Sequence, residues 1–297
     1  MILYRTVVAG LIVSLCMLTT SGCSESSNQD TVGKTVYQGS YAIRKAKEIE
    51  GIKGYTEITG DLYVDAPQLV SLDLPDLKRV GGDMLVYAIP ALTSINMPAL
   101  EEVGGALRML GTTELPILEF PSLKTVGAYL WFEFNEGMFS FNLPELTSVG
   151  AEQKEAVEIE NQLVLGDLWV YDNDVMTNFS IPKLTYIRGD LEVDDNTALE
   201  TFSISALAHV PGNLSIHENA VLTDFDLPSM ASVGADIVVF DNPSLAQCLV
   251  DELIKQVKNA EGIEGGYSFC SPTEPNKCNN EYCTCTSTGN TLKASCP

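Results

Sequence analysis

A repeat of 23 residues runs through most of this chain and constrains its fold more than any other feature. An apolar residue followed by proline marks the units, at Leu74-Pro75, Met97-Pro98, Phe120-Pro121, Leu143-Pro144, Ile181-Pro182 and Leu227-Pro228. The first four prolines are 23 residues apart, the next follows after 38 and the last after 46, which is two periods. Periodicity of this length is typical of folds in which each unit buries its apolar side against its neighbours.

Two further columns of apolar residues share the same interruption and keep the same spacing, apart from one step of 22 residues between Leu62 and Met84. They are Val80, Val103, Val126, Val149, Ile187, Val210 and Val233, and Leu62, Met84, Leu107, Leu130, Leu168, Leu191, Leu214 and Ile237. Apolar residues alternate within a unit, as at Leu168 and Val170, which is the period of a strand. Prolines and glycines at fixed offsets suit corners between short strands. The repeat therefore predicts a mainly β fold, a β-solenoid of about eight coils of 23 residues.

A partial column of asparagines lies five residues after the apolar column that runs from Leu62 to Ile237. Its members are Asn135, Asn173, Asn196, Asn219 and Asn242, whereas the first three coils carry Pro67, Ile89 and Thr112. A buried turn asparagine can bond backbone groups in its own coil and in the next one. We therefore expect a structural ladder at this position.

The residues Gly54–Leu62, GYTEITGDL, followed by LxSLxLPxLKRVGG at Leu69–Gly82, resemble the receptor L domain. This family has the leucine-rich-repeat-like β-helix of the insulin and epidermal growth factor receptors, and it includes fungal cell-wall and bacterial surface proteins. The resemblance covers about residues 41–247 and implies a right-handed β-solenoid. It implies little about function, because the same fold serves receptors, wall proteins and lipoproteins.

The N-terminus predicts export. Residues 1–22 hold one charge and a short apolar run, the form of a secretory leader. The leader ends in Thr20-Ser21-Gly22-Cys23, which resembles the bacterial lipobox and implies that Cys23 carries a lipid. The alternative is an ordinary leader with an incidental thiol. Residues 23–40 begin with a polar stretch and are expected to form a flexible tether, and in lipoproteins Ser24 implies the outer membrane or cell surface.

The end of the chain predicts a capped and cross-linked terminus. A helical face made of Leu245, Leu249, Leu253 and Val257 would cover the last coil. Residues 248–297 would then form the cap helix and a small cysteine-rich tail. Six cysteines lie there, Cys248, Cys270, Cys278, Cys283, Cys285 and Cys296. Disulfides suit an exported chain, and a zinc site is the alternative. At the other end, residues 41–55 are expected to form a cap of strand, turn and helix.

Composition excludes several classes of function. The formal net charge is −23 and the isoelectric point about 4.2, which argues against binding nucleic acid or anionic lipid by charge. The membrane would be reached through the lipid anchor only. Two histidines leave little room for a histidine-built metal site, so no metal and no cofactor are predicted. The chain is expected to be a monomer.

A candidate binding surface comes from the outward positions of the first strand in each coil. Both tryptophans of the chain occupy one such position on successive coils. The predicted ligand-binding residues are Tyr63, Leu85, Tyr87, Leu110, Trp131, Trp169 and Tyr171. Large exposed apolar patches usually mark interaction surfaces. The alternative is that the insertion at residues 151–165, expected to be a loop or short helix, covers this stripe.

No pattern typical of catalysis is present in the sequence. Glu133 and Asp194 could face a glycan as a glycosidase pair. In a repeating sequence, however, two carboxylates are easily placed near one another by chance. The sequence has no phosphate loop and no HExxH motif. We therefore predict a non-enzymatic surface lipoprotein that binds a protein or glycan ligand. A structural envelope protein without a specific ligand and a carbohydrate-active enzyme remain the alternatives.

Overall fold

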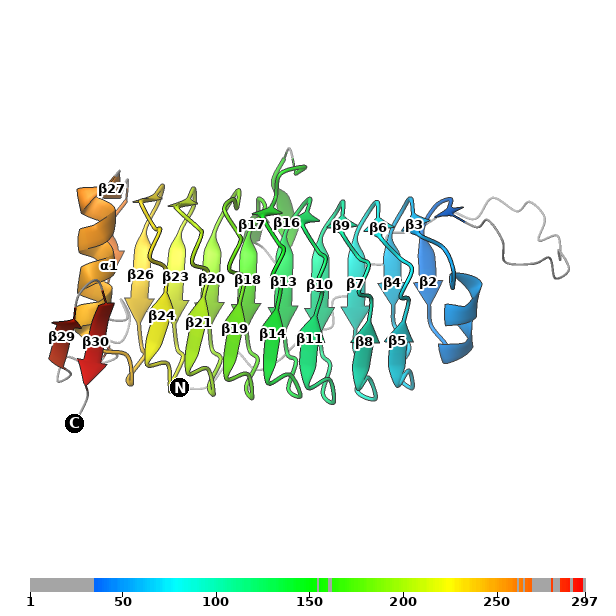
Figure 1. The fold of residues 1–297 in the computed structure, drawn as a ribbon, viewed down its shortest axis with the longest axis horizontal. Helices are drawn as coiled ribbons and strands as arrows, with labels where there is room; N and C mark the ends of the chain where they lie inside the picture. The colour runs from blue at the N-terminus through cyan, green and yellow to red at the C-terminus, as the bar shows by residue number, and fades with distance from the viewer. Residues whose placement is uncertain are drawn as a thin grey trace, which may run out of the picture. The chain divides into compact units, whose positions relative to one another are not determined.

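The computed structural model describes residues 35–153, 155–159, 162–260, 262–263, 265–268, 279, 284–288 and 291–295. These residues form a parallel β-solenoid of about nine turns, whose coils follow one another in a row (Figure 1). The predicted β-solenoid is thereby confirmed. The leader, Cys23 and most of the tether lie outside the described residues. Within the described part of the chain, no helix is long and apolar enough to cross a membrane.

Ten parallel strands, one from each successive coil, form the sheet that we call the long sheet. In spatial order they are β2 (Tyr41–Ile43), β4 (Leu62–Val64), β7 (Met84–Tyr87), β10 (Leu107–Leu110), β13 (Leu130–Glu133), β18 (Leu168–Tyr171), β20 (Leu191–Asp194), β23 (Leu214–His217), β26 (Ile237–Phe240) and β28 (Tyr267–Ser268). The apolar column from Leu62 to Ile237 is in register throughout this sheet, as in the pairing of Leu107 with Leu130. The single 38-residue step therefore leaves the register intact, as Leu130 pairs with Leu168.

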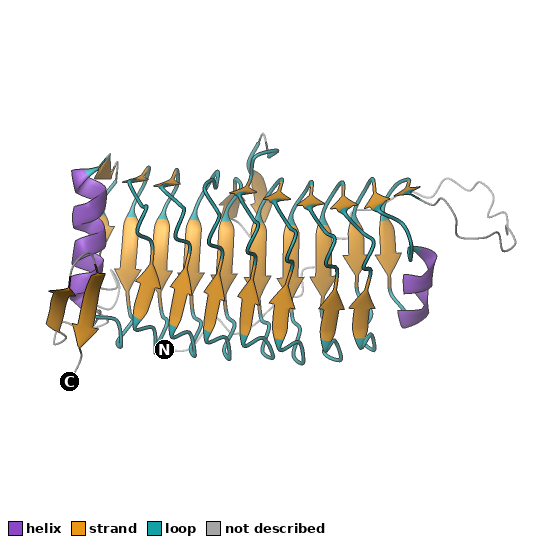
Figure 2. Ribbon diagram, in the orientation of Figure 1, coloured by secondary structure: helices purple, strands orange, loops and turns teal. Residues whose placement is uncertain are grey.

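Two further sides complete each coil (Figure 2). One side contains β5 (Ser71–Asp73) with β8 (Ser94–Asn96), and β11 (Ile117–Glu119), β14 (Ser140–Asn142), β19 (Asn178–Ser180), β21 (Thr201–Ser203) and β24 (Asp224–Asp226). The other contains β1 (Val36–Tyr37), β3 (Glu57–Ile58), β6 (Arg79–Val80), β9 (Glu102–Val103), β12 (Thr125–Val126) and β15 (Ser148–Val149), then β22 (His209–Val210), β25 (Ser232–Val233) and β27 (Gly262–Ile263). We call the side that runs from β5 to β24 the second side.

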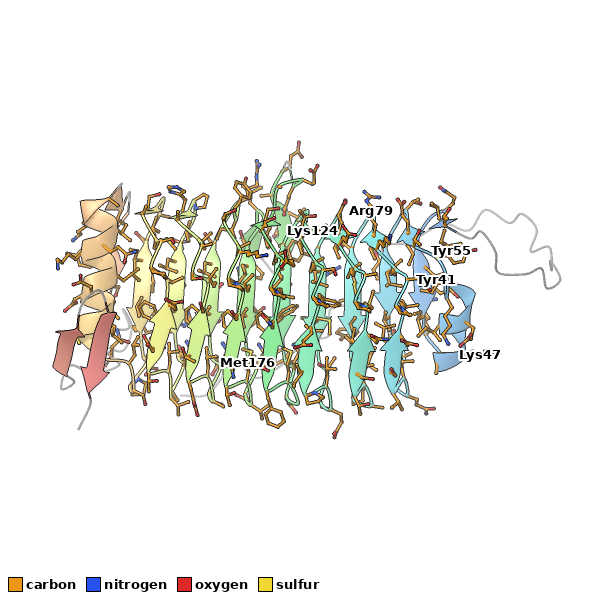
Figure 3. All side chains as sticks on the ribbon, in the orientation of Figure 1. Tyr41, Lys47, Tyr55, Arg79, Lys124 and Met176 are labelled. Carbon is orange, nitrogen blue, oxygen red and sulfur yellow. The ribbon has the colours of Figure 1, made fainter. Side chains whose placement is uncertain are left out.

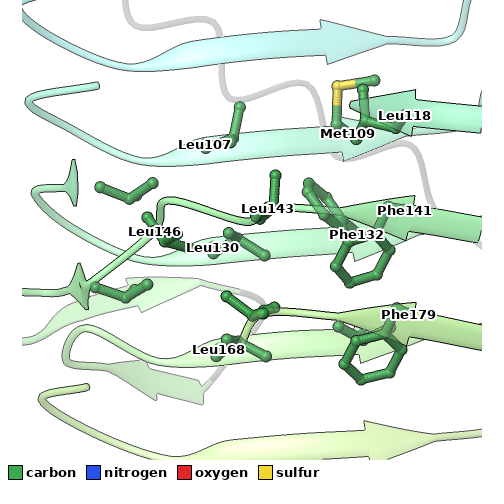
Figure 4. Packing of buried hydrophobic residues seen from close by; sticks show 14 of the residues in the cluster. Leu107, Met109, Leu118, Leu130, Phe132, Phe141, Leu143, Leu146, Leu168 and Phe179 are labelled. Atoms are coloured by element: carbon green, nitrogen blue, oxygen red, sulfur yellow. The ribbon is translucent and has the colours of Figure 1, made fainter. Parts of the chain in front are cut away.

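One apolar core runs through the coils between these sides. Inward side chains of the long sheet meet those of the second side, as Phe132 meets Phe141 with 4.8 Å between ring centroids (Figure 4). Equivalent rings then stack from coil to coil, at 4.7 Å for Phe141 and Phe179 and at 5.1 Å for Phe179 and Phe202. Because no coil encloses its own core, stability comes from the stacking of neighbours.

The asparagine column forms the expected ladder. The side chain of Asn196 accepts a hydrogen bond from the backbone N–H of Asn173 at 3.1 Å and donates to the carbonyl of Val170 at 2.9 Å. The residue before each ladder position has a positive φ, for example 46° at Asp195. Thr112 ends the ladder on one side, where its hydroxyl donates to Asn135 at 2.7 Å.

Aspartates make a second ladder at the corner that leads into the long sheet. Oδ1 of Asp61 accepts the backbone N–H of Asp83, and Oδ1 of Asp83 accepts that of Ala106, both at 2.9 Å. Glycine is required beside these carboxylates, because a Cβ at Gly105 would overlap Oδ1 of Asp83. The recurring aspartates thus have a structural role.

The first coil begins earlier than the repeat indicates. Strand β1 lies inside the segment assigned to the tether, and β2 adds a coil before the eight predicted ones. The 3₁₀ helix η1 (Ala46–Gly51) covers this end with Ile49 buried. The ring centroid of Tyr37 lies 5.1 Å from that of Tyr41 and 5.7 Å from that of Tyr55. Figure 3 labels Tyr41 and Tyr55 at this end of the solenoid. These edge-to-face contacts complete the cap.

At the opposite end lies α1 (Gln247–Asn259), the predicted cap helix. Its apolar face is buried against the core, with Val250 and Val257 fully covered. The chain then returns to the solenoid, since β27 pairs with β25 and β28 pairs with β26. The solenoid therefore continues beyond residue 247. Cys248 on α1 is disulfide-bonded.

The tail supplies one more piece of the ladder. The Asn279 side chain accepts from Nδ2 of Asn242 at 3.1 Å and donates to the carbonyl of Val239 at 2.7 Å. It thus occupies the place of the next coil. Farther along, β29 (Thr284–Thr288) and β30 (Thr291–Ser295) form an antiparallel hairpin. The side chains of the other five tail cysteines lie outside the described residues, so the disulfide set as a whole stays a prediction.

The insertion is a β-hairpin, so the expectation of a loop or short helix is wrong. Strands β16 (Val157–Ile159) and β17 (Gln162–Val164) pair antiparallel. The side-chain amide of Gln153 donates to the carbonyl of Val164 at 2.7 Å, and its oxygen accepts the N–H of Gly166 at 2.9 Å. This buried side chain ties the base of the hairpin to the coil that follows.

Candidate functional site

The side chains of the long sheet that point away from the core make up its outer face, where the sequence places the candidate site. Strand pairing confirms the predicted alignment, since Trp131 lies directly opposite Trp169 and Glu133 directly opposite Tyr171. The next strand continues the rows with Glu192 and Asp194. Residues that are far apart in the sequence therefore form rows across this face.

Both tryptophans are covered, so the expectation of an exposed tryptophan stripe is wrong. Trp131 and Trp169 are each 4% exposed. They belong to a small apolar cluster outside the main core, the tryptophan cluster, made of Ala106, Tyr129, Trp131, Val164 and Trp169. Val164 comes from the insertion hairpin and is fully buried. The physical reason is that each indole carries about 150–250 Å² of largely apolar surface, which the hairpin removes from water.

The edges of this cluster are polar. The guanidinium carbon of Arg108 lies 5.9 Å from the ring centroid of Tyr129, and its Nη2 lies 3.3 Å from Oδ2 of Asp83. The indole N–H groups of both tryptophans are buried without a hydrogen-bond partner in the described part of the chain. An unpaired buried donor costs about 1–3 kcal/mol, so apolar contact has to outweigh that cost.

The N-terminal part of the stripe remains accessible. Tyr87 is 41% exposed, and Tyr63, Leu85 and Leu110 are half-buried. The Tyr63 hydroxyl donates to Oδ2 of Asp61 at 2.9 Å, and burial together with this hydrogen bond raises the pKa of Tyr63 to about 12. We call these four residues on β4, β7 and β10 the aromatic strip. Tyr171, the last predicted residue, is half-buried against the tryptophan cluster, and Leu110 of the strip also packs against that cluster.

The outward positions of the second side have a different character. They carry mainly hydroxyl, amide and carboxylate groups that bond from coil to coil, as Asn96 does with Asp73 at 2.6 Å and Ser203 with Asp226 at 2.8 Å. Ile117, which is 54% exposed, lies among them, and Phe139, equally exposed, directly precedes β14 on the neighbouring coil. The outer face of the long sheet differs because half-exposed Leu85, Tyr87 and Leu110 project from the outward positions of two paired strands.

A second group on the outer face was missed by sequence reasoning, which predicted no metal site because the chain has only two histidines. Glu192 and Asp194 are two residues apart on β20, and His217 lies on β23 directly opposite Asp194. Nδ1 of His217 is 3.7 Å from Oδ2 of Asp194, and its Nε2 is 3.9 Å from Oε1 of Glu192. The available signal was the spacing of 23 residues between Asp194 and His217.

Electrostatics perturb all three members of this group. Burial, followed by repulsion from Asp190 and Asp167, raises the pKa of Glu192 to about 7. Burial, followed by repulsion from Glu192 and other carboxylates, raises the pKa of Asp194 to about 9. Burial lowers the pKa of His217. Burial therefore disfavours the charged form of each of these three side chains.

The carboxylate pair considered for glycoside hydrolysis is not brought together. Glu133 lies on β13 and Asp194 on β20, with Tyr171 of β18 between them in the same row. Glu133 is 8% exposed. Two strand spacings amount to roughly 9.6 Å between these backbone positions, so the two residues are not neighbours in the sheet.

Comparisons with protein-family models, with curated proteins and with solved structures find no match to this chain.

Proposed function

We propose that this protein is an exported, lipid-anchored binding protein that holds a protein or glycan ligand on the aromatic strip. The observation that carries the proposal is the 41% exposure of Tyr87 beside half-buried Leu85 and Leu110. Aromatic rings offer a large contact area at a small entropic cost, and they stack on sugars or fill apolar pockets. The surrounding backbone is rigid sheet, which favours a preformed surface.

Charge narrows the class of ligand. The net charge of −23 disfavours acidic partners over neutral or basic ones. Near the strip, Asp83 and Arg108 form an ion pair that leaves polar groups at its edge. A neutral glycan or a protein surface with apolar and basic groups fits this arrangement.

The proposal contains no catalytic step and no cofactor. The proposed location at the membrane surface rests on the leader at residues 1–22 and on Cys23, which would carry the lipid. A tether of about twelve residues at roughly 3.3 Å each would let the solenoid stand tens of ångströms from the membrane. Such a distance suits a ligand outside the membrane surface.

Two probes test the binding surface. A glycan array compares wild type with the double variant Leu85→Ser, Tyr87→Ala, and with Ile117→Ser as the matched control on the second side. A photo-crosslinking residue at position 87, and at position 117 as its control, traps protein partners on living cells. On the array, we expect a glycan that wild type and Ile117→Ser bind and that the double variant does not. On cells, we expect a crosslinked partner from position 87 and none from position 117.

A different outcome would favour a structural envelope protein. The covering of Trp131 and Trp169 supports that alternative, because it removes the largest rings from the exposed surface. Absence of any glycan signal, together with equal crosslinking at positions 87 and 117, would overturn the binding proposal. Melting temperatures of the variants show whether each remains folded.

A further inference from the structure

We propose that Glu192, Asp194 and His217 bind a divalent first-row metal ion on the outer face of the long sheet, with Zn²⁺ as the best-suited ion. One imidazole and two carboxylates are a ligand set that such ions take in proteins, with water in the remaining positions. Ca²⁺ prefers about six to eight oxygen ligands, so a three-residue site that includes a nitrogen suits it poorly.

The spacing of the ligand atoms carries this inference. One atom from each of the three side chains lies within 4.8 Å of the other two. Ligands placed about 2.0–2.2 Å from a tetrahedral zinc ion lie roughly 3.4 Å from one another. Nδ1 of His217 lies 3.7 Å from Oδ2 of Asp194, which is too long for a hydrogen bond and close to that spacing. The 3.9 Å to Oε1 of Glu192 is measured from Nε2, the other ring nitrogen, and a single ion takes one of the two nitrogens. Glu192 therefore joins the set through the 4.8 Å limit that its ligand atom shares with the other two. Small side-chain rotations would bring the three groups around one ion.

The charge balance points to a cation. Among the described residues, no lysine or arginine forms an ion pair with Glu192 or Asp194, and the nearby charged groups are carboxylates. Nδ1 of His217 is buried without a hydrogen-bond partner in that same part of the chain. A divalent ion bound by this nitrogen would offset the negative charge of the two carboxylates beside it.

The site is also held in place by its surroundings. The His217 ring stacks on Phe240 with 4.8 Å between centroids and 3° between planes. Glu192 and Asp194 project from a strand that is paired on both sides, by β18 and by β23. A rigid set of ligands binds with little ordering cost. The proposal is independent of the aromatic strip, which lies on β4, β7 and β10.

Calorimetric titration with Zn²⁺, and separately with Mn²⁺ and Ca²⁺, tests the site on the full folded chain with its cysteines oxidised. We expect one Zn²⁺ site per chain. Its affinity should fall about tenfold or more in Asp194→Asn and in His217→Phe, which keeps the stacking on Phe240. Binding of Co²⁺ should give visible absorption bands in wild type that the two variants lose.

The other histidine supplies the matched control. His209 lies on β22, where its Nδ1 is 2.9 Å from Oγ of Ser232, so His209→Ala should keep the wild-type Zn²⁺ affinity. All variants retain the cysteines, which separates this site from any zinc bound in the tail. Equal Zn²⁺ affinity in wild type, Asp194→Asn and His217→Phe, with melting temperatures showing all three folded, would overturn the proposal.

Discussion

The indole ring of Trp131 meets that of Trp169 edge to face, with 5.2 Å between ring centroids and 80° between planes. The two residues are 38 positions apart in the sequence but directly opposite in the sheet. The hairpin that lengthens this step supplies Val164, which packs against both in one cluster. The insertion that interrupts the repeat thus covers the surface that its neighbouring coils would otherwise expose.

Trp131→Ala should therefore behave as a core substitution. We expect a loss of about 3–5 kcal/mol in the free energy of unfolding, because a buried aromatic ring is replaced by a cavity. Tyr87→Ala, on the exposed part of the same face, should change it by only about 0.5 kcal/mol. Denaturant unfolding measures both. A small effect of Trp131→Ala would mean that the ring is not covered in solution.

The asparagine ladder should be a large source of stability at its centre. Asn196→Ala leaves the N–H of Asn173 and the carbonyl of Val170 buried without their partners. At about 1–3 kcal/mol for each orphaned group, we expect a loss of roughly 3 kcal/mol or more. Asn178→Ala, at an exposed position, is the control and should cost little. Similar costs for both variants would contradict a structural role for the ladder.

Asn279 should control the stability of the C-terminal end. Asn279→Ala removes the bonds to Asn242 and to the carbonyl of Val239, and the cost should be roughly 2 kcal/mol. Its Nδ2 also lies 3.2 Å from Oε1 of Gln247, the first residue of α1. Hydrogen exchange should therefore rise in α1 and stay unchanged in β7. Unchanged exchange in α1 would show that the helix is held without this contact.

Asp167 should make stability fall as the pH rises through the acid range. Burial raises the pKa of this carboxyl from 3.8 to about 6 in the folded protein. Folding thus favours the protonated form, so the contribution is fully present below about pH 4 and is lost as the pH rises to about 6 and beyond. The difference of about two pKa units corresponds to at most about 3 kcal/mol.

Asp167→Asn removes this titration while keeping an oxygen that can accept the N–H of Asp190. Between pH 4 and pH 8, the unfolding free energy of the variant should therefore fall by less than that of wild type. The difference between the two proteins should be up to the amount given above. Urea unfolding at both pH values measures it. The same pH dependence in wild type and variant would show that the carboxyl does not titrate in this range.

Cys23→Ser tests the proposed anchor. Without the thiol no lipid can be attached, so the exported chain should move from the membrane fraction to the soluble fraction. Cell fractionation with immunodetection measures this, and Cys16→Ser within the leader is a matched control that should leave the chain with the membrane. A Cys23→Ser variant that stays with the membrane would place the anchor elsewhere.

Repetition made most of the fold predictable from the sequence. Three apolar columns with one shared interruption determine which residues pair between coils, and alternation within each strand determines which of them face inward. The asparagine column was predictable for the same reason, since a polar group repeated at one turn can bond from coil to coil. The ends were less predictable, because β2 and β28 lack the repeat's motif, so that their places in the long sheet follow only from their pairing.

What covers an outward position was decided by tertiary structure alone. The sequence by itself determined that Trp131 and Trp169 point outward together. The hairpin that buries them lies outside the repeat and has no periodic signal. The approach of Glu192 and Asp194 to His217, and the place of Asn279 at the end of the ladder, likewise depend on how separate segments pack. Local periodicity specifies the direction of a side chain, whereas its burial and its charge depend on neighbours brought by segments outside the repeat.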